Sequence, residues 1–367
     1  MPTVAPSHNS PPPQAATSFI DGTYEYSEII GSWTYQLGAS SIDLPPIPIT
    51  PGGFLRGVTI TVSSTGASGG SYTADGQYMV FSNISLETVD GTPILYPMNG
   101  FSYALAETYC RPWQISPLID PDQSSTTNPG FTFRLSNELR ATLGTLPNTD
   151  ARAQYRLRLS LNSLAGLYAT APSPAPTVTV QVAVETYAQP PATTLAGKPV
   201  AQLPDGLTIQ RFLSHQLVTG LSNGDNTIQA TRTGNLLRSH ILVFRNSSGV
   251  RTDLATDPIR FRVDNTQLFV TTGARMKYNA KVFLDGFGAI GLPGIGTAAY
   301  QQVFTGVYFL PRYQNVGHMT GQSWLGTTPQ TFVQYEVLGA QAAGTCEIIT
   351  EDLAPKSSAI PPYLENI

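Results

Sequence analysis

Gly286-Phe-Gly-Ala-Ile-Gly291 has the G-x-G-x-x-G spacing that holds a dinucleotide phosphate where a strand turns into a helix. Such a site needs a helix directly after the glycines and, about 20 residues later, an acidic residue for the ribose. Pro293 blocks that helix, and no Asp or Glu occurs between Gly286 and Tyr335. The segment therefore predicts a glycine-rich loop without a bound cofactor.

The other residues that could bind a metal or act as a nucleophile are scattered along the chain. Asp120-Pro-Asp122 is half of a calcium-loop pattern, without the further carboxylates at fixed spacing. His8, His215, His240 and His318 include no pair at zinc-ligand spacing, and no G-x-S-x-G nucleophile turn occurs. We therefore expect no catalytic residue, no cofactor-binding residue and no metal site, and we expect that the protein is not an enzyme.

The chain is weakly charged and slightly acidic. Of its 367 residues 12% are charged, which is about half the usual share, and the net charge is −4. The first Lys or Arg is Arg56, and no basic run occurs. Because neutralising nucleic-acid phosphates requires clustered Lys or Arg, we expect no direct contact with nucleic acid. A weakly charged surface is typical of faces that a permanent assembly covers.

The two cysteines and the N-terminus indicate the compartment. Cys110 and Cys346 are too few for a disulfide-stabilised scaffold, so buried free thiols are favoured, and a single bridge between them stays open. The N-terminus has neither the charged nor the apolar region of a signal peptide, and no apolar run approaches the roughly 18 residues of a membrane span. We expect synthesis in a cytoplasm without export by the general route.

A strand that occurs twice organises the chain. Gly52–Gly66 and Gly234–Gly249 both begin with a glycine, reach Leu-Arg, continue as a β-branched apolar strand and end at a Ser/Thr-Gly turn. Their arginines, Arg56 and Arg238, lie 182 positions apart, which is half the length of the chain. A period of this size is too long for a solenoid repeat and fits a duplicated domain. We therefore expect two copies of one domain.

The elements around these repeated strands are short strands as well. Apolar and polar residues alternate most clearly at Val178–Val184, and Thr331–Leu338 is its counterpart as the closing strand of the second half. The abundance of Gly and Pro (33 and 30 residues) provides the frequent turns of an all-β protein. Segments 101–113 and 276–284 are also expected to be strands, and a short helix is expected around Gln210–Val218.

Each half therefore holds roughly eight short strands, and eight strands in two packed sheets form a jelly roll. An immunoglobulin-like sandwich is the nearest alternative, but it uses about 100 residues, whereas each half here has about 170. The expected fold class is all-β, with two tandem eight-stranded jelly-roll (β-sandwich) domains and minor short helices in loops.

Composition predicts the domain boundaries. Residues 1–18 are rich in Pro, Ser and Ala and are expected to form an extended N-terminal arm. Jelly roll 1 is expected at 19–189, a Pro-rich linker at 190–204 and jelly roll 2 at 205–344. Residues 345–367 are expected to form a C-terminal tail.

Two tandem jelly rolls of this size, with an uncharged N-terminal arm and no export signal, resemble a known family. The chain resembles the double jelly-roll major capsid proteins of tailless, membrane-containing (tectivirus-like) bacteriophages, which are relatives of the adenovirus hexon lineage. The resemblance is architectural and covers roughly residues 19–344. The features that carry it are the repeated strands at 52–62 and 234–244, the Pro-rich linker at 189–204, and the closing strands at 177–184 and 331–338.

The resemblance implies a major capsid protein that forms a homotrimer. Two rolls per chain give such a trimer six rolls and a pseudo-hexagonal outline, and trimers of this kind tile an icosahedral virion around an internal membrane. The partners implied are further copies of the chain, minor capsid and penton proteins, and the internal membrane through the tails at 1–18 and 345–367. The chain would be made in the host cytoplasm and end in the virion.

Two other classes of function stay open. A phage spike, tail or surface protein with a carbohydrate-binding sandwich would carry clustered, solvent-facing aromatic residues, whereas Trp33, Trp113 and Trp324 are scattered. A cupin-type hydrolase or isomerase would need clustered His and Glu metal ligands, which the histidine spacing does not provide.

Overall fold

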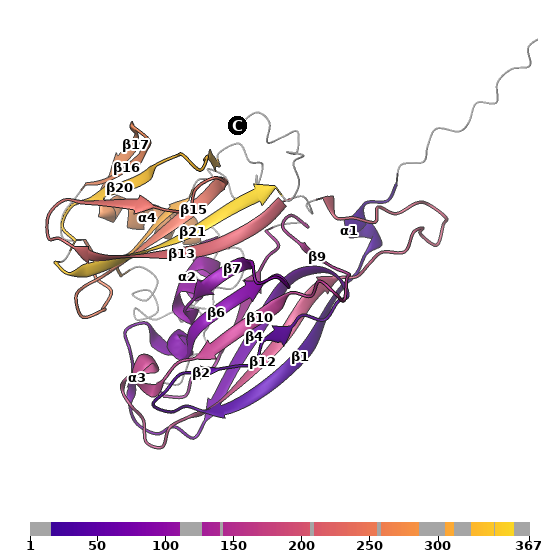
Figure 1. Ribbon diagram of the computed structural model, residues 1–367, viewed down its shortest axis with the longest axis horizontal. Coiled ribbons are helices and arrows are strands. Elements are labelled where there is room, and N and C mark those ends of the chain that lie inside the picture. The colour runs from indigo at the N-terminus through magenta and orange to yellow at the C-terminus, as the bar shows by residue number, and fades with distance from the viewer. Residues whose placement is uncertain are drawn as a thin grey trace, which may run out of the picture.

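The protein forms two β-sandwiches that lie side by side (Figure 1). The computed structural model describes residues 16–110, 127–139, 142–205, 209–254, 258–285, 305–311, 324–340 and 342–355. Each sandwich encloses apolar side chains from both of its sheets in one cluster. The fold class expected from the sequence, two tandem jelly rolls, is confirmed.

Roll 1 consists of two facing sheets. The first has the order β1-β12-β4-β8, with β9 beside β4. Its strands are β1 (Glu25–Gln36), β12 (Thr177–Tyr187), β4 (Gly53–Thr65), β8 (Phe131–Ser136) and β9 (Leu146–Asn148). In the second sheet β10 pairs with β6, β2 and β3, and β6 pairs with β7. These strands are β2 (Ile42–Asp43), β3 (Ile47–Pro48), β10 (Arg156–Leu161), β6 (Phe81–Glu87) and β7 (Pro93–Met98).

Roll 2 repeats this plan. Its first sheet has the order β13-β21-β15-β18, with β19 beside β15, and its second sheet has the order β14-β20-β16-β17. The strands of the first sheet are β13 (Ile209–Leu221), β21 (Gly344–Pro355), β15 (Leu236–Arg245), β18 (Val307–Pro311) and β19 (Leu325–Gly326). The strands of the second sheet are β14 (Asn226–Ala230), β20 (Val333–Val337), β16 (Ile259–Val263) and β17 (Thr266–Thr271). In both rolls the opening strand pairs with the closing strand, and the closing strand pairs with the arginine-bearing strand.

The strand pairing also repeats around the two arginines. In β4 the residue after Arg56 lies opposite Glu185, and in β15 the residue after Arg238 lies opposite Glu351. A register shift falls next to this pair in both ladders, and it leaves each arginine without a cross-strand Cα partner. Arg56 and Arg238, which the sequence places at equal positions of a repeat, therefore occupy equivalent bulges.

Each roll also has a helix at the same place in its strand order. Helix α2 (Gly100–Cys110) connects β7 to β8, and α4 (Gly273–Asp285) precedes β18. The strand expected at 276–284 is therefore wrong, and so is the strand expected at 101–113 over residues 101–110, while residues 111–113 lie outside the described residues. All 11 residues of α2 are buried, so its sequence shows no polar face, whereas the buried side of α4 carries Met276, Ala280 and Leu284 at helical spacing. The helix expected around Gln210–Val218 is also wrong, because that segment lies in β13.

The remaining short elements lie in the connections. They are α1 (Phe19–Gly22), the 3-10 helix η1 (Gly76–Val80), α3 (Leu164–Leu167), and the paired strands β5 (Ser71–Tyr72) and β11 (Tyr168–Thr170).

The closing strand of roll 2 corrects one expected boundary. Thr331–Leu338, expected to close the second half, contains β20 of the second sheet of roll 2. The closing strand is β21, which lies between β13 and β15 and includes residues 345–355 of the tail expected at 345–367. Its acidic residues Glu347, Glu351 and Asp352 look like a solvated tail in the sequence, but all three are buried against arginines. The other expected boundaries stay predictions, and residues 1–15 and 356–367 lie outside the described residues.

The two rolls share one continuous sheet. Strand β13 pairs with β7 in parallel at Leu213 and Leu95, so the second sheet of roll 1 continues into the first sheet of roll 2. Helix α2 lies between the two rolls (Figure 1). Alternate residues of β15 therefore face two cores, with Leu242 and Phe244 inside roll 2 and Ile241 and Val243 in the cluster shared with roll 1.

Candidate functional site

Of the residues that the sequence singled out for chemistry, the structure describes His215 and His240. The glycine motif at 286–291, Asp120-Pro-Asp122, His8 and His318 lie outside the described residues. His240 is fully buried in roll 2, where its Nδ1 is hydrogen-bonded to the hydroxyl of Tyr335. His215 lies on β13, and its Nδ1 is 3.6 Å from Oε1 of Glu347. Within the described ranges, no three His, Cys, Asp or Glu side chains come together as a metal site would require.

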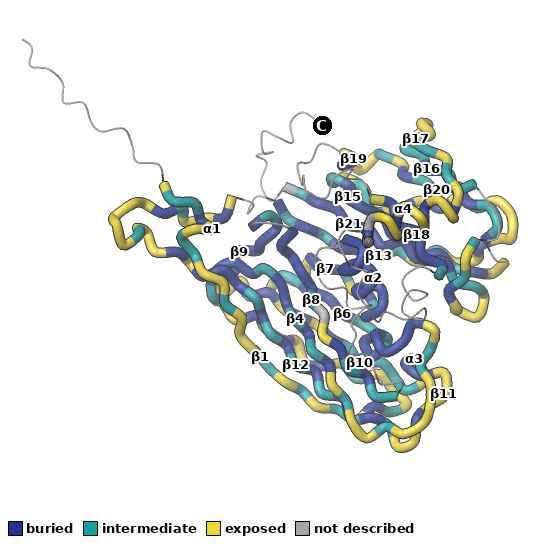
Figure 2. The backbone as a smooth tube through the Cα atoms, turned by 180° about the vertical axis from the view of Figure 1, so that it is seen from behind, coloured by how far each residue is buried: buried dark blue, intermediate teal, exposed yellow. Residues whose placement is uncertain are grey.

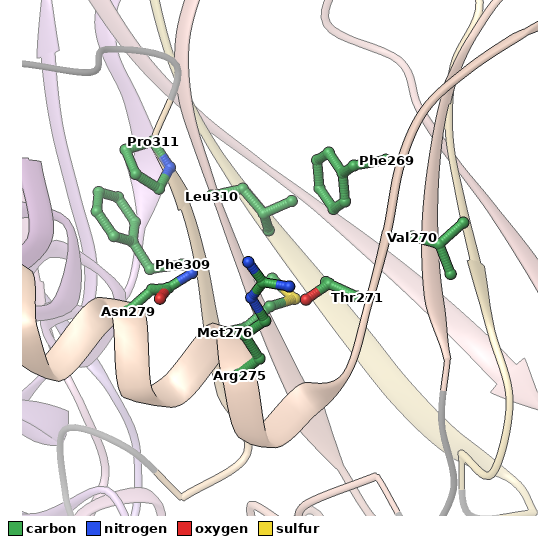
Figure 3. Close-up of a pocket in the computed structure, with 9 residues that line it drawn as sticks. All are labelled: Phe269, Val270, Thr271, Arg275, Met276, Asn279, Phe309, Leu310 and Pro311. Atoms are coloured by element: carbon green, nitrogen blue, oxygen red, sulfur yellow. The ribbon is translucent and has the colours of Figure 1, made fainter.

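A pocket of about 340 Å³ lies in roll 2 between β17, α4 and β18 (Figure 3). Phe269, Phe309 and Leu310 contribute apolar walls, and Arg275 is the cation among the described residues that line it. These lining residues include no carboxylate, histidine or cysteine. The described lining residues therefore form an apolar pocket with one positive charge, and they include no pair of groups for acid–base or nucleophilic chemistry.

The most deeply buried charged side chains that the fold brings together lie at the junction between the rolls. Glu351 accepts hydrogen bonds from Nε of Arg211 at 2.7 Å and from Nη1 of Arg238 at 2.5 Å. On its other side, Arg211 is 3.2 Å from Glu107 of α2 and also donates to a backbone carbonyl of roll 1. The side chains of Arg211 and Glu351 are 0% exposed. Two arginines and two glutamates therefore form a buried, electrically neutral cluster across the junction.

A second cluster at the junction surrounds Glu347. Ser102 of α2 donates to its carboxylate at 2.5 Å, and His215 and Arg245 lie within 4.0 Å. Burial raises the pKa of Glu347, but the hydrogen bonds from His215 and Ser102 and the charge of Arg245 outweigh it, so the pKa lies below its ordinary value. Glu347 is therefore held ionised in the folded state.

A third cluster joins the rolls through Asp75. Arg245 and Arg251 of roll 2 reach this roll 1 carboxylate at 2.5 and 2.8 Å. The guanidinium of Arg251 also lies 4.7 Å from the ring centroid of Phe101, at the start of α2. Burial lowers the pKa of Arg251, and the neighbouring charge of Asp75 offsets only part of this.

The cysteines are free and buried, one at the junction and one in roll 2. Sγ of Cys110 lies 3.4 Å from Oγ of Ser239, on the opposite roll. Burial raises the pKa of Cys110 to about 12, and burial also raises the pKa of Cys346. Because the thiolate is the reactive form, neither thiol is placed to act as a nucleophile. The favoured interpretation of two buried thiols is confirmed, and the disulfide alternative is wrong.

The junction clusters consist of charged groups that pair with one another. The junction charges are buried, and each is neutralised by a partner from the same or the opposite roll. Removing one member of such a cluster leaves an unpaired buried charge, which costs about 3–5 kcal/mol. The junction therefore fixes the orientation of one roll relative to the other.

Among the described helices, none is long and apolar enough to cross a membrane.

The fold is similar to solved structures of viral major capsid proteins. The major capsid protein of STIV (Sulfolobus turreted icosahedral virus) has a TM-score of 0.62 at 12% identity, over 94% of this chain and 99% of that one. The major capsid protein of bacteriophage PM2 has a TM-score of 0.53 at 11% identity, over 91% and 99%. The Faustovirus major capsid protein has a TM-score of 0.51 at 9% identity, over 96% and 92%. At such identities the likeness shows the double jelly-roll fold alone.

Comparison of the sequence itself gives no relative. No protein-family model matches the chain, and no curated protein matches it.

Sequence reasoning missed the junction clusters. Arg238 stood out through its place in the repeat, but its partner Glu351 lies 113 positions away, and Arg211 lies 104 positions from Glu107. Pairs so distant leave no local pattern. The one available indication was three acidic residues within an otherwise apolar stretch, Glu347–Leu353, which is the signature of a strand whose charges are paired.

Proposed function

We propose that the chain is a major capsid protein, which assembles as a homotrimer and tiles an icosahedral viral shell. The observation that supports this most strongly is the side-by-side placement of two rolls with identical strand order, joined by a buried neutral junction. Three such chains present six similar rolls, which is the number that a pseudo-hexagonal building block needs. The three solved proteins compared above are capsid proteins, which agrees with the proposal.

The proposed role is structural and not enzymatic. In the described residues, the buried charged groups at the junction pair with one another, and burial raises the pKa values of the two thiols. The proposed partners are other copies of the chain, then minor capsid and penton proteins. The proposed location is the virion, with the terminal arm and tail toward an internal membrane or neighbouring trimers.

The carbohydrate-binding alternative gains no specific support. It requires exposed aromatic clusters, but Trp324 is 3% exposed and Trp33 packs partly buried against the core of roll 1. Trp113 lies outside the described residues.

Electron microscopy of the purified chain tests the proposal. Negative-stain class averages of a capsid building block should show a hexagonal outline with threefold symmetry. Two-lobed single chains at the same protein concentration would refute the trimer. A matched control is the same preparation dissociated in urea, which should lose the hexagonal classes.

A further inference from the structure

The junction inside the chain shows how one roll binds the next. Helix α2 of roll 1 covers one face of the β13-β21-β15-β18 sheet of roll 2. Ser102 contacts Glu347, Glu107 contacts Arg211, and the ring of Tyr109 lies 4.9 Å from that of Phe309. The contact is therefore a helix laid against the outward face of a jelly-roll sheet.

Roll 2 has the equivalent helix, α4, and part of its surface is exposed. One side is buried: Met276 packs into the core of roll 2, and Ala280 and Leu284 lie in the cluster shared with roll 1. The opposite side presents Tyr278, which is 66% exposed, and Val282, which is 50% exposed. Exposed large apolar side chains at i and i+4 form one stripe on a helix. The exposed positions that flank this stripe include two cations, Arg275 and Lys281.

Roll 1 has the equivalent sheet, β1-β12-β4-β8, and its strand register shows which side chains face outward. The roll 2 face beneath α2 is apolar at three adjoining positions, Ile241, Phe309 and Ile349. The equivalent positions on roll 1 carry polar or small side chains, Thr59, Arg134 and Ala183. A face with polar and small side chains tolerates contact with water before assembly. The apolar face under α2 is already covered within the folded chain. Figure 2 shows exposed residues along β1, at the outer edge of this sheet.

The two equivalent faces carry opposite charge at one register position. On roll 2, Arg211 pairs with Glu107 of α2 as well as with Glu351 of its own roll. On roll 1, Glu25 occupies the register position that Arg211 has on roll 2. The roll 1 cluster has three carboxylates and two guanidiniums, on Glu25, Glu138, Glu185, Arg56 and Arg134. Glu25 is the exposed member of this cluster, and a cation from a docked helix would pair with it as Glu107 of α2 pairs with Arg211 on roll 2.

We propose that the exposed face of α4 in one chain docks on the outward face of the β1-β12-β4-β8 sheet in a second copy. The proposal rests on the homotrimer proposed above and identifies its contact surface. The partner helix supplies Arg275 and Lys281 to the roll 1 cluster, while Tyr278 and Val282 bury their apolar surface. The two faces lie on different rolls and far from one another in both views (Figures 1 and 2), so the contact is heterologous, and three such contacts would close the ring of the proposed trimer.

Charge reversal tests the contact, with native mass in solution as the readout. Arg275→Glu with Lys281→Glu should raise the concentration at which the trimer half-dissociates by at least about tenfold, because two like-charged contacts replace two attractive ones. The sheet variant is Glu25→Lys, at a side chain that is 60% exposed. It should also raise the concentration at which the trimer half-dissociates. Combining all three substitutions in one chain should restore assembly, because both faces then change sign.

The controls separate failure of the contact from failure of the trimer. Arg152→Glu with Lys198→Glu changes the net charge equally at two exposed positions away from both faces, and should leave the trimer intact. Circular dichroism checks that each variant folds. A wild-type monomer would overturn the proposed function itself. A wild-type trimer that the α4 variant leaves unchanged, or whose loss the combined variant does not repair, would overturn only the proposed contact.

Discussion

Replacing Glu351 by Gln tests the buried cluster that joins the two rolls. In the folded chain Glu351 neutralises Arg211 and Arg238, and its side chain is 0% exposed. The amide keeps the shape and some hydrogen bonds but removes the negative charge, so one buried positive charge is left without compensation. The expected loss in free energy of unfolding is about 3–5 kcal/mol.

Glu336 provides a matched control on the surface of the same roll. It also pairs with two arginines, Arg260 at 3.3 Å and Arg262 at 3.1 Å, whose side chains are each 40% exposed. Because water screens these pairs, Glu336→Gln should cost at most about 1 kcal/mol. Urea unfolding of both variants at one fixed protein concentration measures the difference, since an oligomer's stability depends on concentration. Equal losses in the two variants would refute the conclusion that burial makes the junction cluster strong.

Three further predictions use other parts of the fold. Gly66→Ala should cost about 1 kcal/mol, and Gly53→Ala should destabilise the chain at least about twice as much. Both glycines have positive φ, but a Cβ at Gly53 would lie 2.1 Å from a backbone oxygen of β12, whereas a Cβ at Gly66 would meet open space. Equal shifts of the thermal unfolding midpoint would contradict this. The pKa of Glu347 is lowered from 4.5 in the folded state, so the contribution of its ionised form to stability is complete above pH 4.5 and is lost as pH falls through the lower folded value. Glu347→Gln should therefore flatten the fall in unfolding free energy below pH 4.5. An unchanged dependence of that free energy on pH would argue against the ionised state. A thiol reagent at pH 8 should leave Cys110 and Cys346 unmodified in the folded chain and modify both in denaturant, whereas rapid reaction before unfolding would contradict their burial.

The fold was predictable because its main features are local patterns. Val178, Val180, Val182 and Val184 alternate with polar residues and are all buried, so the two-residue period identifies β12 directly. The repeated Leu-Arg strands also indicated the duplication, since the structure places both arginines at equivalent bulges.

The helices and the last strand were not predictable in the same way. Helix α2 is buried on all sides between the two rolls, so tertiary packing removes the polar face that would reveal a helix. Strand β21 carries Glu347, Glu351 and Asp352, whose burial depends on arginines that are distant in the sequence. A prediction from neighbouring residues has no access to those partners.

The junction and the proposed contact surface follow from comparing the two halves in three dimensions. The sequence aligned Arg56 with Arg238 but did not reveal that Glu25 occupies the register position of Arg211. That equivalence depends on strand pairing, which forms only when the chain folds. It shows that the two outward faces carry opposite charge at this register position.

Native mass spectrometry of the wild-type chain across a dilution series tests the central proposal most directly. The proposal predicts one dominant species at three times the chain mass of 39.3 kDa, which persists on dilution. A species at the mass of one chain at every concentration would contradict it.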